Sequence, residues 1–543
     1  MLLEKFIKSI YTLPNDAKYL TVLDLVPIYF EFDKYQDNLK MFLNNIIENN
    51  IELDSTEKII IENETSPFRY LIFLIRHNHF INYYLELNLI LNGINSSITP
   101  NVIKHNKKLV KQIYKNIDNI GKIHILIISV YEKIISGNYP MSEKYDLKKF
   151  YSRELLRRFI QTLDFKVPSE FNKYLSEKTI MRLKKIYQTV IDTSIQTKTY
   201  IQKLLDSNIF DSNPSKHGLS NFDQEFYIFN LKYMCGLNLN SGSDIEYLYN
   251  WANQYLKYNI NNTKKIIQKI YPHIKTTAYD YKDLLQMINA DENFKFNSEE
   301  ELKNAYISKI NEQYNFVVDN NIPLTNKCEF TTFNNPNSTS GFYLNNCFFL
   351  NTNNWTNVKK FEVRALTMHE SYPGHHLQID LSTHNNKNNY LTTLYQEMFC
   401  TYIEGWALFA EKIHSDIDLS SDFGQSDSDL LRILRIIADI DIHYWGKSPE
   451  EVINKMDDYL ALDRLTIISE VYRYLTLPGQ AISYKIGESI FMGIYYKLKN
   501  ESKTEIKIND PIMIEYYKNI LLQGEVTAEE LLKRHSMSFF YKT

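Results

Sequence analysis

The chain has 543 residues, of which 44% are hydrophobic and 23% are charged, and its formal net charge is −4. The length exceeds that of an ordinary single domain, so we expect one large catalytic unit or two lobes. A nearly neutral charge argues against a general nucleic-acid-binding protein, which would carry a surplus of basic residues. The four cysteines show no C-x-x-C spacing, so we expect neither a disulfide framework nor a cysteine zinc site.

The N-terminal segment MLLEKFIKSIYTLPND does not have the basic, apolar and small-residue regions of a secretory signal. No stretch approaches the roughly 18 uninterrupted apolar residues that a membrane span requires. We therefore expect a cytoplasmic protein with no membrane partner.

Most of the chain has helical periodicity. Apolar residues recur at spacings of three and four, as in 70–75 and 155–163, and only 15 Gly and 14 Pro interrupt the chain. The sequence predicts a mostly α fold, with a helical N-terminal region over 1–215 and a second region over 216–543. That boundary is soft, and one continuous unit is the alternative. Polar runs predict loops at 92–101, 211–221, 334–341, 382–389 and 418–429.

Residues 328–352 (CEFTTFNNPNSTSGFYLNNCFFLNT) differ from their helical surroundings. Short aromatic-rich runs flank turns of Asn, Gly and Ser, which predicts a hairpin or a small sheet. A sheet beside a metal-bearing helix can bind a peptide substrate as an additional strand.

The segment 358–372 is predicted to be helical, because Phe361, Ala365, Leu366 and His369 follow a spacing of three and four. Its end, His369-Glu370, matches the first half of the H-E-x-x-H zinc signature. In that signature two histidines one turn apart bind the metal, and the glutamate acts as general base.

Pro373 occupies the position of the second histidine in that signature. Pro373 and Gly374 should break the helix, and His375 could then reach the metal across the break. The alternative ligand is His376, which would lie about 10 Å from His369 on an unbroken helix. That separation is too long for one zinc ion, so we favour His375. A surface loop of histidines that bind no metal is the remaining alternative.

The segment 390–413 is the most apolar helix candidate, and an all-round apolar helix is expected to be buried. Glu397, Glu404 and Glu411 lie on it at seven-residue spacing. A buried carboxylate without a partner is costly, so the central Glu404 is predicted to be the third metal ligand. The alternative is a solvated stripe or an ion pair with an arginine. Glu397 and Glu411 fit that alternative, or they orient the histidine ligands.

Four segments together resemble one known family, the bacterial proteins of domain-of-unknown-function family 885. The resemblance extends over roughly 320–540, with a weaker similarity at 341–352. The four segments are 369–378 (HESYPGHHLQ), 403–412 (IEGWALFAEK), 435–452 (RIIADIDIHYWGKSPEEV) and 470–487 (EVYRYLTLPGQAISYKIG).

Members of that family look like zinc metallopeptidases. The resemblance implies a zincin-like catalytic region in which His369, His375 and Glu404 bind Zn²⁺. It also implies that Glu370 is the general base, which takes the proton of the attacking water and passes it to the leaving amine. It draws attention to five further residues, which are Asn351, His443, Arg473, Tyr474 and Tyr484.

Among these residues, His443 and Tyr484 are our candidates for donors to the tetrahedral intermediate, with Tyr474 as a third. Asn351, Arg473 and Tyr474 are candidates for substrate binding. Arg473 could bind the C-terminal carboxylate of a substrate, which would favour carboxypeptidase action. It could equally form a structural pair with Glu470.

The expected function is therefore zinc-dependent peptide hydrolysis, by a carboxypeptidase or an oligopeptidase. Two alternatives remain: a metal-dependent hydrolase of a non-peptide amide or ester, and a helical binding protein without catalysis. The expected partner is a peptide substrate and not a nucleic acid, and a homodimer stays open. Nitrogen and oxygen ligands also bind Mn²⁺, Co²⁺ and Fe²⁺, so zinc is the preferred metal and not the only candidate.

Overall fold

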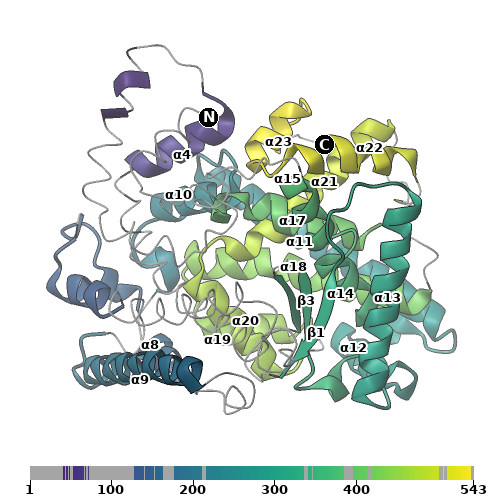
Figure 1. The fold of residues 1–543 in the computed structure, drawn as a ribbon, viewed down its shortest axis with the longest axis horizontal. Helices are drawn as coiled ribbons and strands as arrows, with labels where there is room; N and C mark the ends of the chain where they lie inside the picture. Colours follow the sequence, from purple (N-terminus) through teal and green to yellow (C-terminus); the bar gives the residue numbers. More distant parts are fainter. Residues whose placement is uncertain are drawn as a thin grey trace.

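The computed structural model describes most of the chain after residue 126 and short parts before it. The described ranges are 53–66, 127–139, 141–151, 153–162, 177–210, 216–334, 340–344, 346–384, 396–413, 418–460, 462–500 and 510–539, with a few single residues besides. Within them the predicted mostly α fold is confirmed (Figure 1). None of the described helices is both long and apolar enough to cross a membrane.

The helices up to the sheet are α4 (Ser55–Thr65), α8 (Arg153–Thr162), α9 (Glu177–Asp206), α10 (Gln224–Cys235), α11 (Gly242–Ile270), α12 (Tyr281–Ala290) and α13 (Glu299–Asp319). Those after it are α14 (Glu362–Glu370), α15 (His375–His384), α17 (Cys400–Glu411), α18 (Leu419–His443), α19 (Pro449–Asp457), α20 (Arg464–Thr476), α21 (Gln480–Lys499), α22 (Pro511–Asn519) and α23 (Ala528–Arg534).

The sheet predicted within 328–352 is present. It has three strands, β1 (Glu329–Phe333), β2 (Gly341–Leu344) and β3 (Cys347–Asn351). The central strand β3 runs parallel to β1 and antiparallel to β2.

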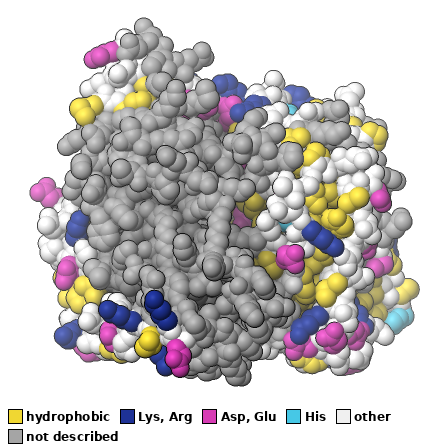
Figure 2. All heavy atoms as spheres, in the orientation of Figure 1, with side chains coloured by type: hydrophobic (Ala, Val, Ile, Leu, Met, Phe, Trp, Pro, Cys, Tyr) yellow, Lys and Arg dark blue, Asp and Glu magenta, His cyan; other side chains and the backbone are white. Residues whose placement is uncertain are grey.

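The two faces of this sheet pack differently, because successive side chains of a strand point to opposite sides. Phe348 and Leu350 join the main core, whereas Phe333, Phe342 and Phe349 form a separate apolar cluster. Figure 2 shows hydrophobic side chains gathered on the right-hand part of the molecule, in the region of the sheet and α13. The face with Phe348 and Leu350 is therefore the one that packs against the helices of the main core.

One hydrophobic core joins residues from both sides of position 215. Leu156 and Leu204 belong to the same cluster as Trp406 and Phe491. The core therefore crosses the position where the sequence suggested a boundary between two regions.

Helices α17 and α21 run side by side in the same direction, since Trp406 pairs with Phe491 and Phe409 with Tyr495. Two glycines allow their backbones to approach closely. A Cβ atom on Gly405 would lie 2.3 Å from the Cα atom of α21 that it faces. This contact brings the glutamate-bearing helix α17 close to the tyrosine-bearing helix α21.

Some predicted boundaries need correction. The predicted loop 418–429 is wrong, because Asp418 accepts a hydrogen bond from the Ser421 N–H and so caps α18, which begins at Leu419. Within its described part, the segment 390–413 has a 3-10 turn (Gln396–Phe399) and then regular helix from Cys400. Residues 390–395, the loop 92–101, most of 70–75 and parts of the loops at 211–221, 334–341 and 382–389 lie outside the described residues.

Candidate metal centre

The helix carrying His369 is broken where the sequence predicts a break. Helix α14 ends at Glu370 and α15 begins at His375, with a cis peptide bond before Pro373. A Cβ atom on Gly374 would lie only 2.0 Å from the His369 carbonyl oxygen, so no larger residue fits there. The Trp406 indole of α17 donates a 2.8 Å hydrogen bond to the Pro373 carbonyl, which ties the break to the third helix.

This break brings three predicted ligands together. The candidate ligand atoms of His369, His375 and Glu404 all lie within 4.8 Å of one another. Glu404 Oε2 is 3.5 Å from each histidine Nε2. Two atoms bonded at about 2.1 Å to one tetrahedral zinc ion lie roughly 3.4 Å apart, so this set of donors fits a metal. No other such cluster of His, Cys, Asp and Glu occurs in the part of the chain that the structure describes.

His376 points away from this group. One ring nitrogen lies 3.1 Å from the Tyr343 hydroxyl of β2, and the other lies 2.8 Å from the Asn326 carbonyl. Its ring also packs edge-on against Tyr372. Both nitrogens of His376 are therefore engaged elsewhere, and His375 is the histidine beside Glu404.

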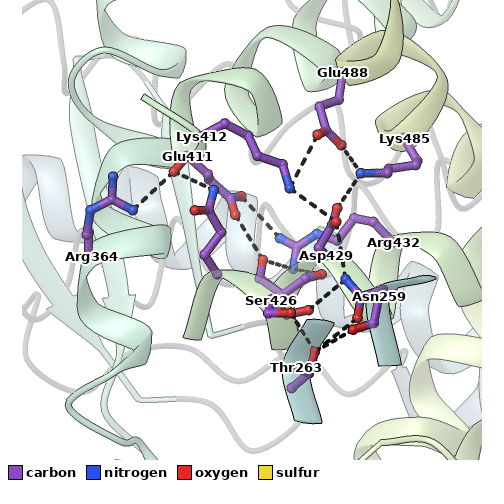
Figure 3. A network of polar contacts seen from close by, with 12 residues as sticks. Asn259, Thr263, Arg364, Glu411, Lys412, Ser426, Asp429, Arg432, Lys485 and Glu488 are labelled. Atoms are coloured by element: carbon purple, nitrogen blue, oxygen red, sulfur yellow. Dashed lines mark hydrogen bonds and ion pairs between the residues drawn. The ribbon is translucent and has the colours of Figure 1, made fainter. Parts of the chain in front are cut away.

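Glu411 orients the ring of His369. Its Oε1 accepts a 2.8 Å hydrogen bond from Nδ1, which leaves Nε2 facing Glu404. Ser428 donates to the same carboxylate at 2.9 Å, and Arg432 lies 3.7 Å from it. Figure 3 shows Glu411 and Arg432 in this network. Glu411 therefore matches the orienting role that the sequence left open.

Buried polar contacts also fix α14 relative to α17. The guanidinium of Arg364 donates to the carbonyls of Glu411 and Ile413 at 3.1 and 2.7 Å, where the C-terminal carbonyls of α17 would otherwise lack partners. Gln425 of α18 donates a further hydrogen bond to the Glu411 carbonyl. Three helices are thus joined at one point near the candidate ligands.

A second buried network lies on the other side of this junction (Figure 3). Lys412 and Lys485 contact Asp429 and Glu488, which gives two positive and two negative groups. Burial alone would raise the pKa of Asp429, but the two lysines lower it to about 2. Because its charges balance internally, this network is a structural support for α17, α18 and α21.

The electrostatics of the candidate ligands suit a cation. Burial alone would lower the pKa of His369, but its contacts with Glu404 and Glu411 outweigh burial and raise that pKa to about 10. The pKa of Glu404 is shifted the other way, since the two histidines outweigh burial and lower it well below its usual range. Burial raises the pKa of Glu370, although both histidines act against that shift. Protons shared between these groups are what a bound metal ion would displace.

Replacing Glu411 with Gln is expected to lower zinc affinity about 10- to 100-fold, because the carboxylate that orients His369 is lost. Affinity would be measured by competition with a fluorescent zinc chelator. Ser420→Ala, at a partly exposed position of α18, is the control and should leave affinity unchanged. Equal affinities of Glu411→Gln and the wild type would contradict the orienting role.

The prediction that His443 donates to a reaction intermediate is wrong. His443 is fully buried, and its Nδ1 accepts a 3.1 Å hydrogen bond from the Leu219 N–H. Its Nε2 donates to the Tyr474 carbonyl at 3.0 Å. Both ring nitrogens are occupied by backbone groups, so His443 joins α18 to α20 and to the turn at Gly218–Asn221.

His443 should make stability depend on pH. Burial lowers its pKa to about 4 in the folded protein, against about 6.5 in an unfolded chain. The contribution of neutral His443 to the free energy of unfolding is therefore fully present above the unfolded pKa. It is lost as pH falls from the unfolded pKa through the folded pKa. The free energy of unfolding should fall by about 2 kcal/mol between about pH 7 and pH 5 through this group alone.

Urea unfolding at the two pH values measures this loss. The control is His443→Gln, which can accept and donate one hydrogen bond but takes up no proton. Between pH 7 and pH 5 the unfolding free energy of this variant should fall by about 2 kcal/mol less than that of the wild type. An equal fall in both proteins would show that His443 is not the responsible group.

Tyr474 also does not fit its predicted role in substrate binding. It is buried, and its hydroxyl donates a 2.6 Å hydrogen bond to Glu470. Arg473 donates to Glu470 at 3.1 Å and to the Gln480 side chain at 2.7 Å. The pair with Glu470 that the sequence left open is thus present.

Tyr484 interacts electrostatically with Glu404, one of the candidate ligands. It is partly buried on α21, and its hydroxyl accepts a 3.2 Å hydrogen bond from Gln480. Burial raises its pKa, and the charge of Glu404 raises it further, which reflects its closeness to the candidate ligands.

Asn351 lies at the end of β3. Its side chain accepts a 3.1 Å hydrogen bond from the Asn353 N–H, and its backbone N–H donates to Ser340. These contacts shape the strand end, and its role in substrate binding stays a prediction.

Sequence reasoning missed several residues that build the centre. Arg364, Trp406 and Arg432 each make contacts across more than one helix. The only signals for them were two arginines and a tryptophan in predicted helical segments, which are not specific.

The comparisons agree with this fold. The model of the family described as bacterial protein of unknown function (DUF885) matches residues 153–510. A search of curated proteins finds no significant match.

Two solved structures share the fold, and both are provisionally described as lipoproteins. The protein from Colwellia psychrerythraea has a TM-score of 0.62 and 17% identity, over 80% of this chain and 77% of its own. The protein from Shewanella oneidensis, whose function is described as unknown, has a TM-score of 0.54 and 15% identity, over 96% of this chain and 99% of its own. At these identities the likeness shows the fold alone. Because the family match covers more than half of the chain, this protein belongs to the DUF885 family of bacterial proteins.

Proposed function

We propose that this protein is a zinc-dependent peptidase. The observation that carries the proposal is the group of His369, His375 and Glu404, with Glu370 directly after the first ligand. Two histidines and one glutamate, with no fourth protein ligand among the described residues, match the pattern of catalytic rather than structural zinc sites.

The zinc ion and Glu370 would have different roles in catalysis. A bound zinc ion would polarise the scissile carbonyl and make water more acidic. Glu370 would accept the proton of the attacking water and deliver it to the leaving amine. Its burial, which raises its pKa, makes the carboxylate a better base than an exposed one.

Tyr484 is the candidate donor to the tetrahedral intermediate. The Gln480 amide donates to the Tyr484 hydroxyl oxygen, so the hydroxyl hydrogen remains available for a hydrogen bond to the intermediate. The raised pKa keeps this phenol protonated at neutral pH, which a hydrogen-bond donor requires.

The sheet supports a peptide rather than a small amide as substrate. Strand β2 lies at an edge of the described sheet and packs against α14. Its Tyr343 contacts His376, next to a candidate ligand. An extended peptide paired with this edge would lie close to α14, the helix that carries His369.

The test is cleavage of a defined peptide mixture by the purified protein, followed by mass spectrometry. Activity should disappear with a chelator and return when zinc is added. If no peptide is cleaved while amide or ester substrates are hydrolysed in a chelator-sensitive way, the protein is a metal-dependent hydrolase of another class. If nothing is hydrolysed and zinc does not bind, the proposal is wrong.

A further inference from the structure

A cluster of two arginines and one glutamate lies between α18 and α20. Arg435 donates two hydrogen bonds to Glu470, at 3.0 and 3.2 Å, and Arg473 donates one at 3.1 Å. Glu470 also accepts the Tyr474 hydroxyl hydrogen. Two positive charges thus share one carboxylate.

This cluster has two positive charges and only one negative charge, that of Glu470. Arg435 is only 8% exposed, and the Nε of Arg473 is buried without a hydrogen-bond partner among the described residues. Asp439 also interacts with Arg473, but its oxygens accept hydrogen bonds from Tyr227 and Gly479, and burial raises its pKa to about 7. A buried cation of this kind calls for an anionic partner.

The cluster is linked to the candidate metal centre by α21. Gln480 contacts Arg473 and the Tyr484 hydroxyl, and its amide also lies 3.8 Å from Cys400 Sγ. Cys400 precedes Glu404 by one turn of α17, and one turn is about 5.4 Å. The guanidinium of Arg435 lies over the Tyr484 ring, 4.6 Å from its centre.

Tyr484 lies between the two sites, because its electrostatic partners include Glu404 as well as Arg435 and Arg473. The side chain of Arg473 is 23% exposed, so this edge of the cluster is accessible. A negative group at the end of a substrate could reach it while the scissile carbonyl lies beside Glu404.

We infer that Arg473, supported by Arg435, binds the terminal carboxylate of a peptide substrate, which makes the protein a carboxypeptidase. The inference rests on the proposed function. The reaction is ordinary hydrolysis: the peptide C–N bond breaks, water supplies OH to the acyl carbon and H to the amine, and no oxidant or reductant takes part.

The experiment uses the full chain loaded with zinc and three forms of the same peptides. The first form has a free C-terminal carboxylate, the second is amidated, and the third is amidated but ends in Glu. The free acids should be cleaved near their C-terminus with a kcat/KM about 50-fold above that of the amides, the size expected for a charge-assisted contact. The third form shows whether a side-chain carboxylate can replace the terminal one.

Arg473→Gln tests the residue itself. It should lower kcat/KM for the free acids far more than for the amides, so that the ratio of the two falls toward one. Because Arg435 still holds Glu470 through two hydrogen bonds, this variant should remain folded. Arg464→Gln, an exposed position on the same helix, is the matched control and should behave as wild type.

The outcomes separate the two proposals. If the wild type cleaves acids and amides equally, or if Arg473→Gln lowers both equally, the carboxylate site is wrong and the peptidase stands. Preference for the third form over the free acids would assign the site to an acidic side chain and overturn the carboxypeptidase. If no peptide of any form is cleaved, the proposed function fails, and the carboxylate site fails with it.

Discussion

Glu370→Gln is expected to keep zinc at the wild-type level and to lower kcat by about 10²- to 10⁴-fold, the usual contribution of a general base. Glutamine has nearly the same shape as glutamate but cannot accept the proton of the attacking water. Glu370 is not one of the three candidate ligands, so the metal should remain bound. Turnover of a cleaved peptide and zinc content would be measured on the same protein sample.

Glu362→Gln provides the matched control for this experiment. It is the same substitution on the same helix, and Glu362 receives a hydrogen bond from the Lys359 N–H and contacts none of the candidate ligands. Its activity should remain near that of the wild type. If Glu370→Gln kept more than about a tenth of the wild-type rate, another group would have to be the base.

Gly374→Ala should have the largest effect on stability, at roughly 3 kcal/mol or more of unfolding free energy. The added Cβ atom would lie 2.0 Å from the His369 carbonyl and 2.2 Å from that of Met368. Both are backbone atoms in the last turns of α14, so the break between the helices must move. His375 follows directly and would leave its place beside Glu404, so zinc should be lost as well.

Ser371→Ala is the control from the same segment. It removes one hydrogen bond to the Thr367 carbonyl and adds no atom, so its cost should be about 1 kcal/mol. Urea unfolding and zinc content would be measured for both variants. A fully stable, zinc-binding Gly374→Ala protein would show that the close approach at this glycine is not required.

The parts of the centre that follow from local geometry could be predicted from the sequence. The rise of a helix and the length of a zinc–nitrogen bond were enough to favour His375 over His376, and the structure gives them separate partners. The aromatic runs around Asn and Gly likewise predicted the small sheet.

The wrong predictions concern residues whose role depends on contacts with segments that are distant in the sequence. His443 looked like a catalytic histidine, but its partners are the backbone groups of Leu219 and Tyr474, far away in the sequence. The cluster of Arg435 and Arg473 around Glu470 depends on the packing of α18 against α20, which periodicity does not reveal. The polar run 418–429 resembled a loop, yet capping by Asp418 and apolar residues such as Phe423 made it helical.

The most direct test of the account is the zinc content of four proteins after dialysis against zinc-free buffer, measured by elemental analysis. Wild type and His376→Gln should each hold one zinc ion per chain, because His376 faces Tyr343 and Asn326. His375→Ala and Glu404→Ala should hold almost none, since each loses one of three ligands. Full zinc in both alanine variants, or its loss only in His376→Gln, would contradict the proposed centre.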